Sequence, residues 1–324
     1  MSEMKYSEMQ YVDRPVSRIF FGTASITSVP KQDRDALLDG ILALGVNAID
    51  LARVYMRAED AIGAWMEKRG NRDQLVLLSK CAHPNFLGMK RLNEKAIRKD
   101  FQKSSESLHT DHIDIYLLHR DDPSVPVGDI IQIFNALHSE GKIGAFGASN
   151  WTHTRIAEAN EYAYAHSLIP FTVSSPNYGL AEQIADPWGG GCVTVSGPSN
   201  MKAREWYAEN GMPVIAYSSL GRGFFSGRLK SGAGREDAAK VLDGHAMKAY
   251  WCDGNLERLK RSEQLAAEKG CSVSQIAMAW IYAQPMNTFA VVSTSKPSRM
   301  QQNIDALNIP LSPQEVKWLD LEEE

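Results

Sequence analysis

The strongest constraint on the fold is a regular alternation of short apolar runs and segments with helical spacing. Strict alternation of strand and helix favours a parallel sheet, and about eight such units without an obvious break predict a closed barrel. A doubly wound open sheet is the alternative architecture. The runs that fit buried strands cover 16–21, 46–49, 75–80, 113–118, 143–148, 171–174, 214–217 and 289–292.

The remaining segments complete the predicted architecture. The segments 4–12 and 16–21 flank a turn at 13–15 and predict an N-terminal β-hairpin, while 221–254 is rich in glycine and charge and predicts a long loop. Asn93 is a candidate N-cap, and Ser312 with Glu315 forms a candidate capping box. We therefore predict a (β/α)8 TIM barrel with an N-terminal β-hairpin and extended loops at the C-terminal face, as a single domain over 1–324. The predicted helices cover 33–44, 57–68, 93–108, 130–139, 152–165, 200–209, 256–269, 273–282 and 299–307.

Composition excludes several classes of protein. With 44% hydrophobic and 23% charged residues, the chain has enough apolar material for one large core. The formal net charge of −4 does not favour nucleic acid or an anionic membrane as the partner. No apolar run approaches the ~20 residues that span a bilayer, and the polar N-terminus lacks the core of a signal peptide. The default location is cytoplasmic.

The cysteines and glycines exclude two kinds of site. The four cysteines are widely separated and form no CxxC pair, so we expect reduced residues and no metal. No G-x-G-x-x-G follows the first strand, which counts against a Rossmann site. The glycines around Arg222 have the wrong spacing for that motif, and a flexible loop there is as plausible as a binding role.

Polar residues close the predicted strands. In a barrel the carboxyl ends of the strands share one mouth, where active sites are built. Asp50, Lys80 and His119 end three successive strands, and Tyr55 lies in the loop that follows Asp50. The full set of residues at strand ends is Asp50, Lys80, His119, Asn150, Ser175, Tyr217 and Thr294.

The chemistry of the first four residues fits proton transfer. A lysine at the end of a buried strand is costly unless it is paired, and Asp50 is the obvious partner of Lys80. The ammonium would favour the phenolate, so we expect the pKa of Tyr55 to fall below its ordinary value of about 10. His119 can orient or polarise a carbonyl oxygen. Each residue alone has an ordinary structural interpretation, as a cap, a snorkelling lysine or a hydrogen-bonded histidine, but four on consecutive elements favour a site.

At these residues the chain resembles the aldo-keto reductase superfamily, over nearly its whole length. The segments that carry the resemblance are IDLARVY, LLSK, DIYLLH, GASN, VIAYSSLGRG and TSKPSRMQQN. The family's catalytic tetrad falls on Asp50, Tyr55, Lys80 and His119. The resemblance implies a barrel that binds NADP(H) without a Rossmann fold and transfers hydride from the nicotinamide to an aldehyde or ketone. NADPH is the preferred cofactor and NADH the alternative.

The resemblance also implies cofactor contacts. Tyr217 resembles the tyrosine that stacks on the nicotinamide, and Ser149 and Asn150 resemble the carboxamide contacts. Positions for the pyrophosphate fall on the 218–222 segment, and those for the adenosine and 2′-phosphate on 294–303. A guanidinium such as that of Arg299 fits a phosphate as a fork. The complete expected set is Gly22, Thr23, Asp50, Ser149, Asn150, Ser175, Tyr217, Ser218, Leu220, Arg222, Thr294, Arg299, Gln302 and Asn303.

Three positions depart from the family pattern. Met56 stands where many members carry glycine after the tyrosine, which reshapes the pocket rim. Ser175 replaces a glutamine that binds the carboxamide, so this contact becomes shorter or bridged by water. Ser293 replaces a lysine on the 2′-phosphate in some members, which predicts a weaker preference for NADP. Pocket walls are expected from Phe86, 121–126, Trp151 and the loop through Trp251, and packing is the equal alternative for each of them.

Two other functions compete with a reductase. One is a regulatory subunit on the same barrel, as in the potassium-channel β subunits that resemble this family. The other is a barrel hydrolase or isomerase that uses Asp50 and His119 alone, which leaves Tyr217 and Arg299 without a role. The expected partner is a small carbonyl compound. The sequence leaves the substrate, the direction of the reaction and the choice between monomer and homo-oligomer open.

Overall fold

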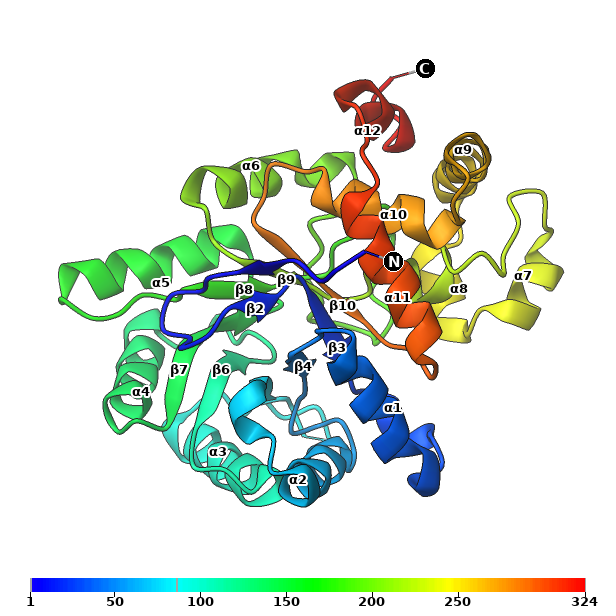
Figure 1. Cartoon of the computed structure of the whole chain (residues 1–324). Coiled ribbons are helices and arrows are strands. Elements are labelled where there is room, and N and C mark those ends of the chain that lie inside the picture. Colours follow the sequence, from blue (N-terminus) through cyan, green and yellow to red (C-terminus); the bar gives the residue numbers. More distant parts are fainter. Residues whose placement is uncertain (1, 86, 324) are drawn as a thin grey trace. The chain divides into compact units, whose positions relative to one another are not determined.

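A computed structural model describes residues 2–85 and 87–323, and it has the predicted barrel order (Figure 1). Eight parallel strands follow the order β10-β3-β4-β5-β6-β7-β8-β9 of a closed barrel. The predicted (β/α)8 fold class is therefore confirmed. The barrel strands are β3 (Ile19–Gly22), β4 (Ala48–Asp50), β5 (Val76–Cys81), β6 (Ile113–Leu118), β7 (Ile143–Ser149), β8 (Val173–Ser175), β9 (Val214–Ala216) and β10 (Thr288–Val292).

Helices follow the strands in alternation, as the sequence predicts. The α-helices of the described residues are α1 (Lys31–Ala43), α2 (Ala58–Arg69), α3 (Glu94–Leu108), α4 (Val127–Ser139), α5 (His153–Ala165), α6 (Met201–Asn210), α7 (Arg235–Val241), α8 (Gly244–Tyr250), α9 (Asp253–Lys269), α10 (Val273–Tyr282), α11 (Pro297–Asp305) and α12 (Pro313–Leu319). Short 3-10 turns are η1 (Ile26–Ser28), η2 (Arg72–Gln74), η3 (Pro198–Asn200), η4 (Gly221–Gly223) and η5 (Ala306–Asn308). No helix among the described residues is long and apolar enough to cross a membrane.

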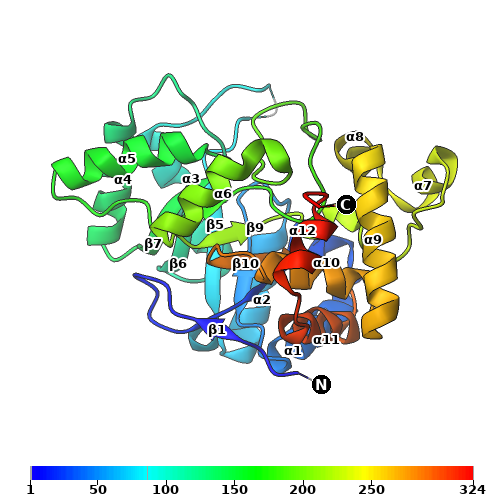
Figure 2. The same ribbon diagram turned by 90° about the horizontal axis from the view of Figure 1, so that it is seen from above.

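The chain divides into two compact units. One contains 5–175 with 293–297, and the other contains the described residues of 1–4, 176–292 and 298–324. The expectation of a single domain stays a prediction. In the second unit α12 packs on α9 and α9 on α10 (Figure 2), and the backbone N–H of Ser2 donates to Asp305 Oδ1 of α11 at 2.8 Å.

The N-terminal hairpin is confirmed, but the strand predicted over 16–21 is divided. β1 (Tyr6–Ser7) pairs antiparallel with β2 (Val16–Ser17), and β3 starts at Ile19 as the first barrel strand. Ser17 causes the break, because its hydroxyl donates to the Ile19 carbonyl at 2.7 Å and accepts from the Ala48 N–H at 3.2 Å. A serine side chain here takes over bonds that a strand backbone would otherwise make.

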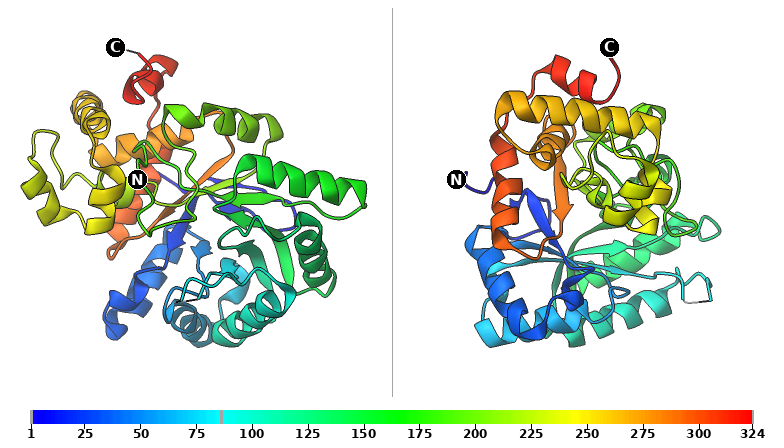
Figure 3. Two further views of the ribbon diagram at one scale, coloured as in Figure 1. Left: turned by 180° about the vertical axis from the view of Figure 1, so that it is seen from behind. Right: turned by 90° about the vertical axis from the view of Figure 1, so that its right-hand side faces the viewer.

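The prediction of a long loop over 221–254 is wrong in its second half. Two short helices, α7 and α8, occupy much of this segment (Figure 3). The carboxylate of Asp243 caps α8 by accepting from the Ala246 N–H at 2.7 Å, and Ala246 and Tyr250 are buried. Helices of seven residues gain most of their stability from packing against the rest of the protein. A glycine-rich and charged sequence therefore does not predict them.

The predicted helix caps are confirmed. Asn93 Oδ1 accepts from the Ala96 N–H at 3.0 Å at the start of α3. Ser312 and Glu315 form the predicted capping box at α12, with bonds of 3.2 Å and 2.6 Å in the two directions. These local signals were readable because a cap depends on residues only three positions apart.

The buried carboxylate of Glu59 connects β5 and the loop after β4, which carry Lys80 and Tyr55, to two helices. Glu59, in the first turn of α2, is 1% exposed and accepts from Ser79 of β5 at 2.6 Å and from Ser104 of α3 at 2.7 Å. It also forms an ion pair with Arg53, which lies in the loop after β4. Arg53 in turn donates to Ser107 Oγ of α3 at 3.2 Å. Glu59 therefore fixes α2, α3, β5 and this loop to one another.

We expect Glu59→Ala to lower the free energy of unfolding by about 3 kcal/mol, because the change leaves two buried hydroxyls and a guanidinium without their acceptor. Urea unfolding followed by circular dichroism measures this loss. Glu67→Ala is the matched control, since Glu67 lies on the same helix with a side chain 69% exposed and should change stability by no more than about 0.5 kcal/mol. Equal losses in the two variants would contradict the role given to Glu59.

Candidate active site

Three adjacent strands bring the predicted tetrad to one end of the first unit. β4 pairs with β5 and β5 with β6, so Asp50 lies opposite Leu78 and Lys80 opposite Leu117 in the ladder. His119 follows β6 directly, and its N–H donates to the Cys81 carbonyl at 2.9 Å. Parallel register therefore brings side chains from distant parts of the sequence to one edge.

Lys80 and Asp50 form a buried ion pair. The two residues are 3% and 4% exposed, and the Lys80 ammonium donates to Asp50 Oδ1 and, at 2.9 Å, to the Leu51 carbonyl. Burial alone would lower the pKa of Lys80, but attraction to Asp50 and Tyr55 outweighs it and raises this pKa. The ammonium is therefore charged at neutral pH. Burial raises the pKa of Asp50, and the Lys80 charge opposes this rise.

Tyr55 is held over the ammonium by its loop. The Arg53 N–H donates to the Lys80 carbonyl at 3.0 Å, and the Tyr55 N–H donates to the Ala52 carbonyl at 2.9 Å. Lys80 Nζ lies 5.1 Å from the centre of the Tyr55 ring. The ring of Tyr55 also meets that of His119 edge to face, with centroids 5.8 Å apart. All four predicted residues are brought together.

The predicted fall in the pKa of Tyr55 is wrong in its net direction. Burial removes the phenol from water and raises its pKa above the ordinary value. The Lys80 charge and its hydrogen bond do lower the pKa, as expected, but the Asp50 charge raises it and burial is the largest effect. The phenol is therefore protonated at neutral pH, with a fixed positive charge beside it.

His119 is a neutral imidazole. Burial, followed by the charge of Lys80, holds its pKa well below the ordinary range. Its Nδ1 is buried and has no hydrogen-bond partner within the part of the chain that the structure describes. A neutral ring with an unsatisfied nitrogen can exchange a hydrogen bond with a ligand oxygen.

Sequence reasoning missed His83, which packs against His119 with ring centroids 4.9 Å apart. His83 lies two residues after β5, and burial lowers its pKa as well. Its position three residues after Lys80 could have indicated a place near the site, but a single histidine in a loop is weak evidence for such a role. The contact between the two rings restricts rotation of the His119 side chain.

Met56 occupies a position that suits glycine. Its φ is 48°, in the left-handed region, and its side chain is 77% exposed. This conformation explains why glycine is expected after the tyrosine, because a side chain there is strained by about 1 kcal/mol. The exposed methionine next to Tyr55 is an apolar group at the rim of the site.

The expected carboxamide contacts in the first unit are tied to one another. Asn150, at φ 61°, donates from its side chain to the His119 carbonyl at 3.2 Å and to Ser149 Oγ at 2.9 Å. Ser149 Oγ donates to the Ser175 carbonyl at 2.8 Å. Thr23 Oγ1 donates to the Asp50 carbonyl at 2.7 Å. Backbone and side chain thus hold these groups rigidly at the ends of β3, β4, β7 and β8.

Residues 293–297 add a short polar segment to the first unit. Ser293 Oγ donates to the Gly22 carbonyl at 2.6 Å, and Thr294 Oγ1 accepts from the Lys296 N–H at 3.1 Å. The hydroxyl of Ser293 therefore has a structural partner. This serine cannot supply the cation that lysine supplies in some members of the resembled family.

In the second unit, the expected pyrophosphate positions form a tight turn after β9. Positive φ values recur at Ser218 (55°), Gly221 (56°), Arg222 (52°) and Gly223 (97°). The turn is closed by its own backbone, because the N–H groups of Gly221 and Gly223 donate to the carbonyls of Ser218 and Leu220 at 2.7 Å and 3.1 Å. Leu220 and Tyr217 are half-buried in the same turn.

The expected adenosine and 2′-phosphate positions lie on α11 of the second unit. Arg299 and Gln302 are exposed, and Asn303 is buried and donates to the Arg299 carbonyl at 3.1 Å. Arg299 lies in the first turn of α11, where the helix dipole disfavours a cation and favours an anion. A phosphate bound there would satisfy both the guanidinium and the helix end.

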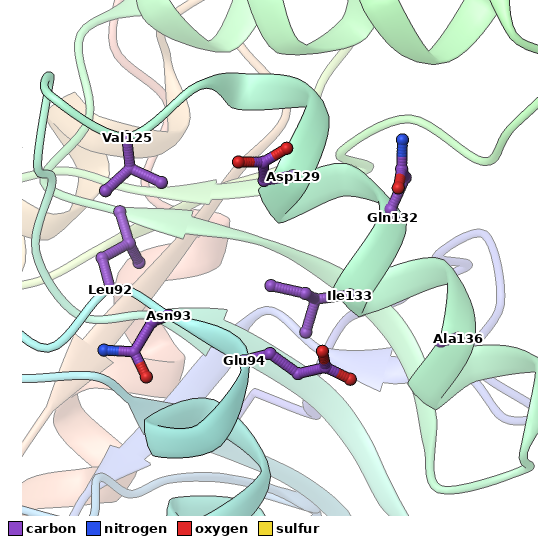
Figure 4. Close-up of a pocket in the computed structure, with 8 residues that line it drawn as sticks. All are labelled: Leu92, Asn93, Glu94, Val125, Asp129, Gln132, Ile133 and Ala136. Carbon is purple, nitrogen blue, oxygen red and sulfur yellow. The ribbon is translucent and has the colours of Figure 1, made fainter.

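A pocket elsewhere in the first unit contains no predicted site residue. It lies between the start of α3 and α4, with a volume of about 470 Å³ (Figure 4). Its lining residues are Leu92, Asn93, Glu94, Val125, Asp129, Gln132, Ile133 and Ala136. Carboxylates from both helices line it, and Glu94 already pairs with Arg98 at 2.8 Å. None of these lining residues is a histidine, lysine, cysteine or tyrosine, so we assign the pocket no catalytic role.

The expected pocket walls have mixed outcomes. Phe86 lies outside the described residues. Trp151 is fully buried and packs against Phe171 with ring centroids 5.5 Å apart, which favours the packing interpretation. Asp121 pairs with Arg155 at 3.6 Å, and Trp251 is half-buried.

Three known proteins are similar to this chain over most of its length. A norsolorinic acid reductase A of Aspergillus parasiticus is 26% identical, over 88% of this chain and 70% of the relative. An uncharacterized oxidoreductase of Bacillus subtilis is 25% identical over 98% and 95%. A probable voltage-gated potassium channel subunit beta of Oryza sativa is 26% identical over 97% and 94%.

The family comparison covers almost the whole chain. The model of the Aldo/keto reductase family matches residues 18–321, from the barrel's first strand to the end of α12. This range includes all four tetrad positions and both expected cofactor segments. Relatives named as oxidoreductases and the barrel order point the same way. The chain is an oxidoreductase that belongs to the aldo/keto reductase family.

Proposed function

We propose that the protein reduces an aldehyde or ketone to an alcohol with NADPH as the preferred cofactor and NADH as the alternative. One observation carries the proposal: the charged Lys80 lies between its partner Asp50 and the ring of Tyr55, with the neutral His119 beside the phenol. These groups suit the protonation of an oxygen on which negative charge develops.

A bound NADPH would supply the hydride to the carbonyl carbon. As the C–O double bond becomes single, charge builds on the oxygen, and Tyr55 gives that oxygen its proton. The resulting phenolate lies next to the Lys80 ammonium, which stabilises it. Asp50 holds the ammonium in place through their ion pair. The sum of the steps is an alcohol and an oxidised cofactor, and solvent returns the proton to Tyr55.

His119 orients the substrate oxygen. Because its ring is neutral, it does not compete with Tyr55 as a charged acid, and it can hydrogen-bond the carbonyl before hydride arrives. The edge-to-face contact with Tyr55 limits where that oxygen can lie. The two side chains thus define the position of the reacting atom.

The raised pKa of Tyr55 is compatible with an acid role. An alkoxide is a stronger base than a phenolate, so proton transfer remains favourable even from a weak phenol. Burial keeps the proton on Tyr55 until charge develops on the substrate, and Lys80 then lowers the energy of the phenolate. The proton donor is therefore in its protonated form at neutral pH, as reduction requires.

The cofactor-binding residues are proposed from the resemblance, residue by residue. Arg222, whose Nε is unsatisfied in the turn after β9, suits the pyrophosphate, and Arg299 suits the 2′-phosphate as an exposed guanidinium at a helix start. Ser293, engaged with Gly22, supports only a modest preference for NADPH over NADH.

The four cysteines are free, which supports our further proposal of a cytoplasmic location.

A regulatory subunit is the second candidate, favoured by the likeness to a probable potassium channel subunit beta. The complete tetrad favours catalysis, because a cofactor sensor has no need of a proton donor. Steady NADPH consumption with a panel of aldehydes supports the reductase. Retention of the cofactor without turnover of any carbonyl supports the regulatory function instead.

We expect Tyr55→Phe to lose about 10²–10⁴-fold in carbonyl reduction while it still binds NADPH, because only the acid is removed. Turnover is measured by NADPH absorbance and binding by NADPH fluorescence. Tyr116→Phe is the matched control: Tyr116 is buried in β6, and its hydroxyl has no hydrogen-bond partner among the described residues. Near-normal turnover in Tyr55→Phe would refute the acid role.

We expect the reduction rate to be flat from about pH 6 to 9. Reduction needs protonated Tyr55, whose raised pKa keeps the proton bound throughout this range, and His119 is neutral throughout it. The rate falls only as pH rises through the pKa of Tyr55. Alcohol oxidation needs the phenolate, so its rate should rise with pH over the same range. Initial rates in both directions measure this, and a fall in reduction between pH 6 and 8 would contradict the assignment.

A further inference from the structure

The loop 186–192 of the second unit presents an exposed tryptophan. Trp188 is 45% exposed, in a chain whose other large aromatic rings are mostly buried. Both ends of the loop are fixed by one carboxylate, because Asp186 accepts from the Trp188 N–H at 2.7 Å and from the Cys192 N–H at 2.8 Å. His245 of α8 bonds to the Pro187 carbonyl at 2.8 Å. The base of the loop is thus held beside α8.

The top of the loop is built for an unusual backbone path. Three glycines follow Trp188, with φ values of 89°, 148° and 80°. A Cβ at Gly189 or Gly190 would meet no atom within 4 Å, so crowding does not explain these glycines. Their conformations are ones that other residues rarely adopt, so glycine is needed for this backbone path.

The indole ring lies against two side chains that the family resemblance assigns to the cofactor. The guanidinium of Arg222 stacks on the ring, with its central carbon 5.3 Å from the centroid. The ring of Tyr217 lies beside it, with centroids 6.3 Å apart and planes inclined by 50°. An exposed indole over an arginine and a tyrosine offers a flat apolar face next to a cation.

Arg222 itself is only partly satisfied. Its Nη2 donates to Asp243 Oδ2 at 2.8 Å, while its buried Nε has no hydrogen-bond partner among the described residues. A buried guanidinium nitrogen without an acceptor is costly, and a phosphate oxygen is a natural acceptor for it.

We propose that Trp188 is a further cofactor-binding residue. Its indole ring covers the part of the dinucleotide that Tyr217 and Arg222 bind. The ligand is a dinucleotide with a pyrophosphate, so the inference rests on the proposed function. The bonds of Asp186 and His245 fix the backbone at 187–188, so the indole is held beside Tyr217 and Arg222. Its role is to slow release of the cofactor.

The test is the release rate of NADPH from the full chain. NADPH is pre-bound and then displaced with excess NADP+, and energy transfer from protein tryptophans to NADPH is followed by stopped flow. We expect Trp188→Ala to release NADPH about tenfold faster or more, and Trp188→Phe, which keeps an aromatic face, to lie between it and the wild type. Reduction by Trp188→Ala under saturating NADPH confirms that this variant is folded.

Trp318→Ala is the matched control, because Trp318 of α12 makes a comparable stack, with Arg261 at 5.2 Å. Its release rate should equal that of the wild type. Unchanged or slower release from Trp188→Ala overturns the proposal and leaves the reductase intact. Equal acceleration in both alanine variants also overturns it, since the effect would then be general. A wild type that binds no NADPH overturns this inference together with the proposed function.

Discussion

The ion pair between Lys80 and Asp50 is the interaction on which the site depends. An ammonium in a barrel interior is unfavourable unless a carboxylate and further acceptors surround it. Here Asp50 and the Leu51 carbonyl provide them, and Thr23 fixes the end of the strand that carries Asp50. Glu59 then joins the neighbouring Ser79 to the helix layer. The pair is thus a local contact supported by the packing of several elements.

The burial that surrounds this ion pair also makes ionisation of the neighbouring phenol of Tyr55 less favourable. Removing Tyr55 from water raises its pKa, and Lys80 only partly reverses the rise. A site that needed a free phenolate would have to be wetter or more positive. A site that needs a proton held ready for an alkoxide gains from this balance, because the proton stays on the phenol until it is required. Burial and the Lys80 charge together therefore keep this phenol protonated at neutral pH.

The sequence was informative where structure depends on short-range patterns. Buried parallel strands appear in the sequence as apolar runs, so the sequence alone predicts their ends and hence the positions of Asp50, Lys80 and His119. Caps at Asn93 and Ser312 were readable for the same reason. The contacts of Glu59 with β5 and α3 were not readable, because its partners lie 20 and 45 residues away. The helices α7 and α8 were missed because packing stabilises them more than composition does.

The net pKa of Tyr55 shows a deeper limit of sequence reasoning. A nearby lysine can be inferred from strand ends, but the depth of burial cannot, and here burial decides the sign. Arg222 illustrates the same point, since the resemblance gives its ligand but not its competitor Asp243. If the proposed pyrophosphate binds Arg222, it exchanges with that carboxylate or shares the guanidinium with it. The two side chains of the pair are 26% and 53% exposed, and an exposed ion pair contributes only about 0–1 kcal/mol, so Asp243 opposes such a ligand weakly.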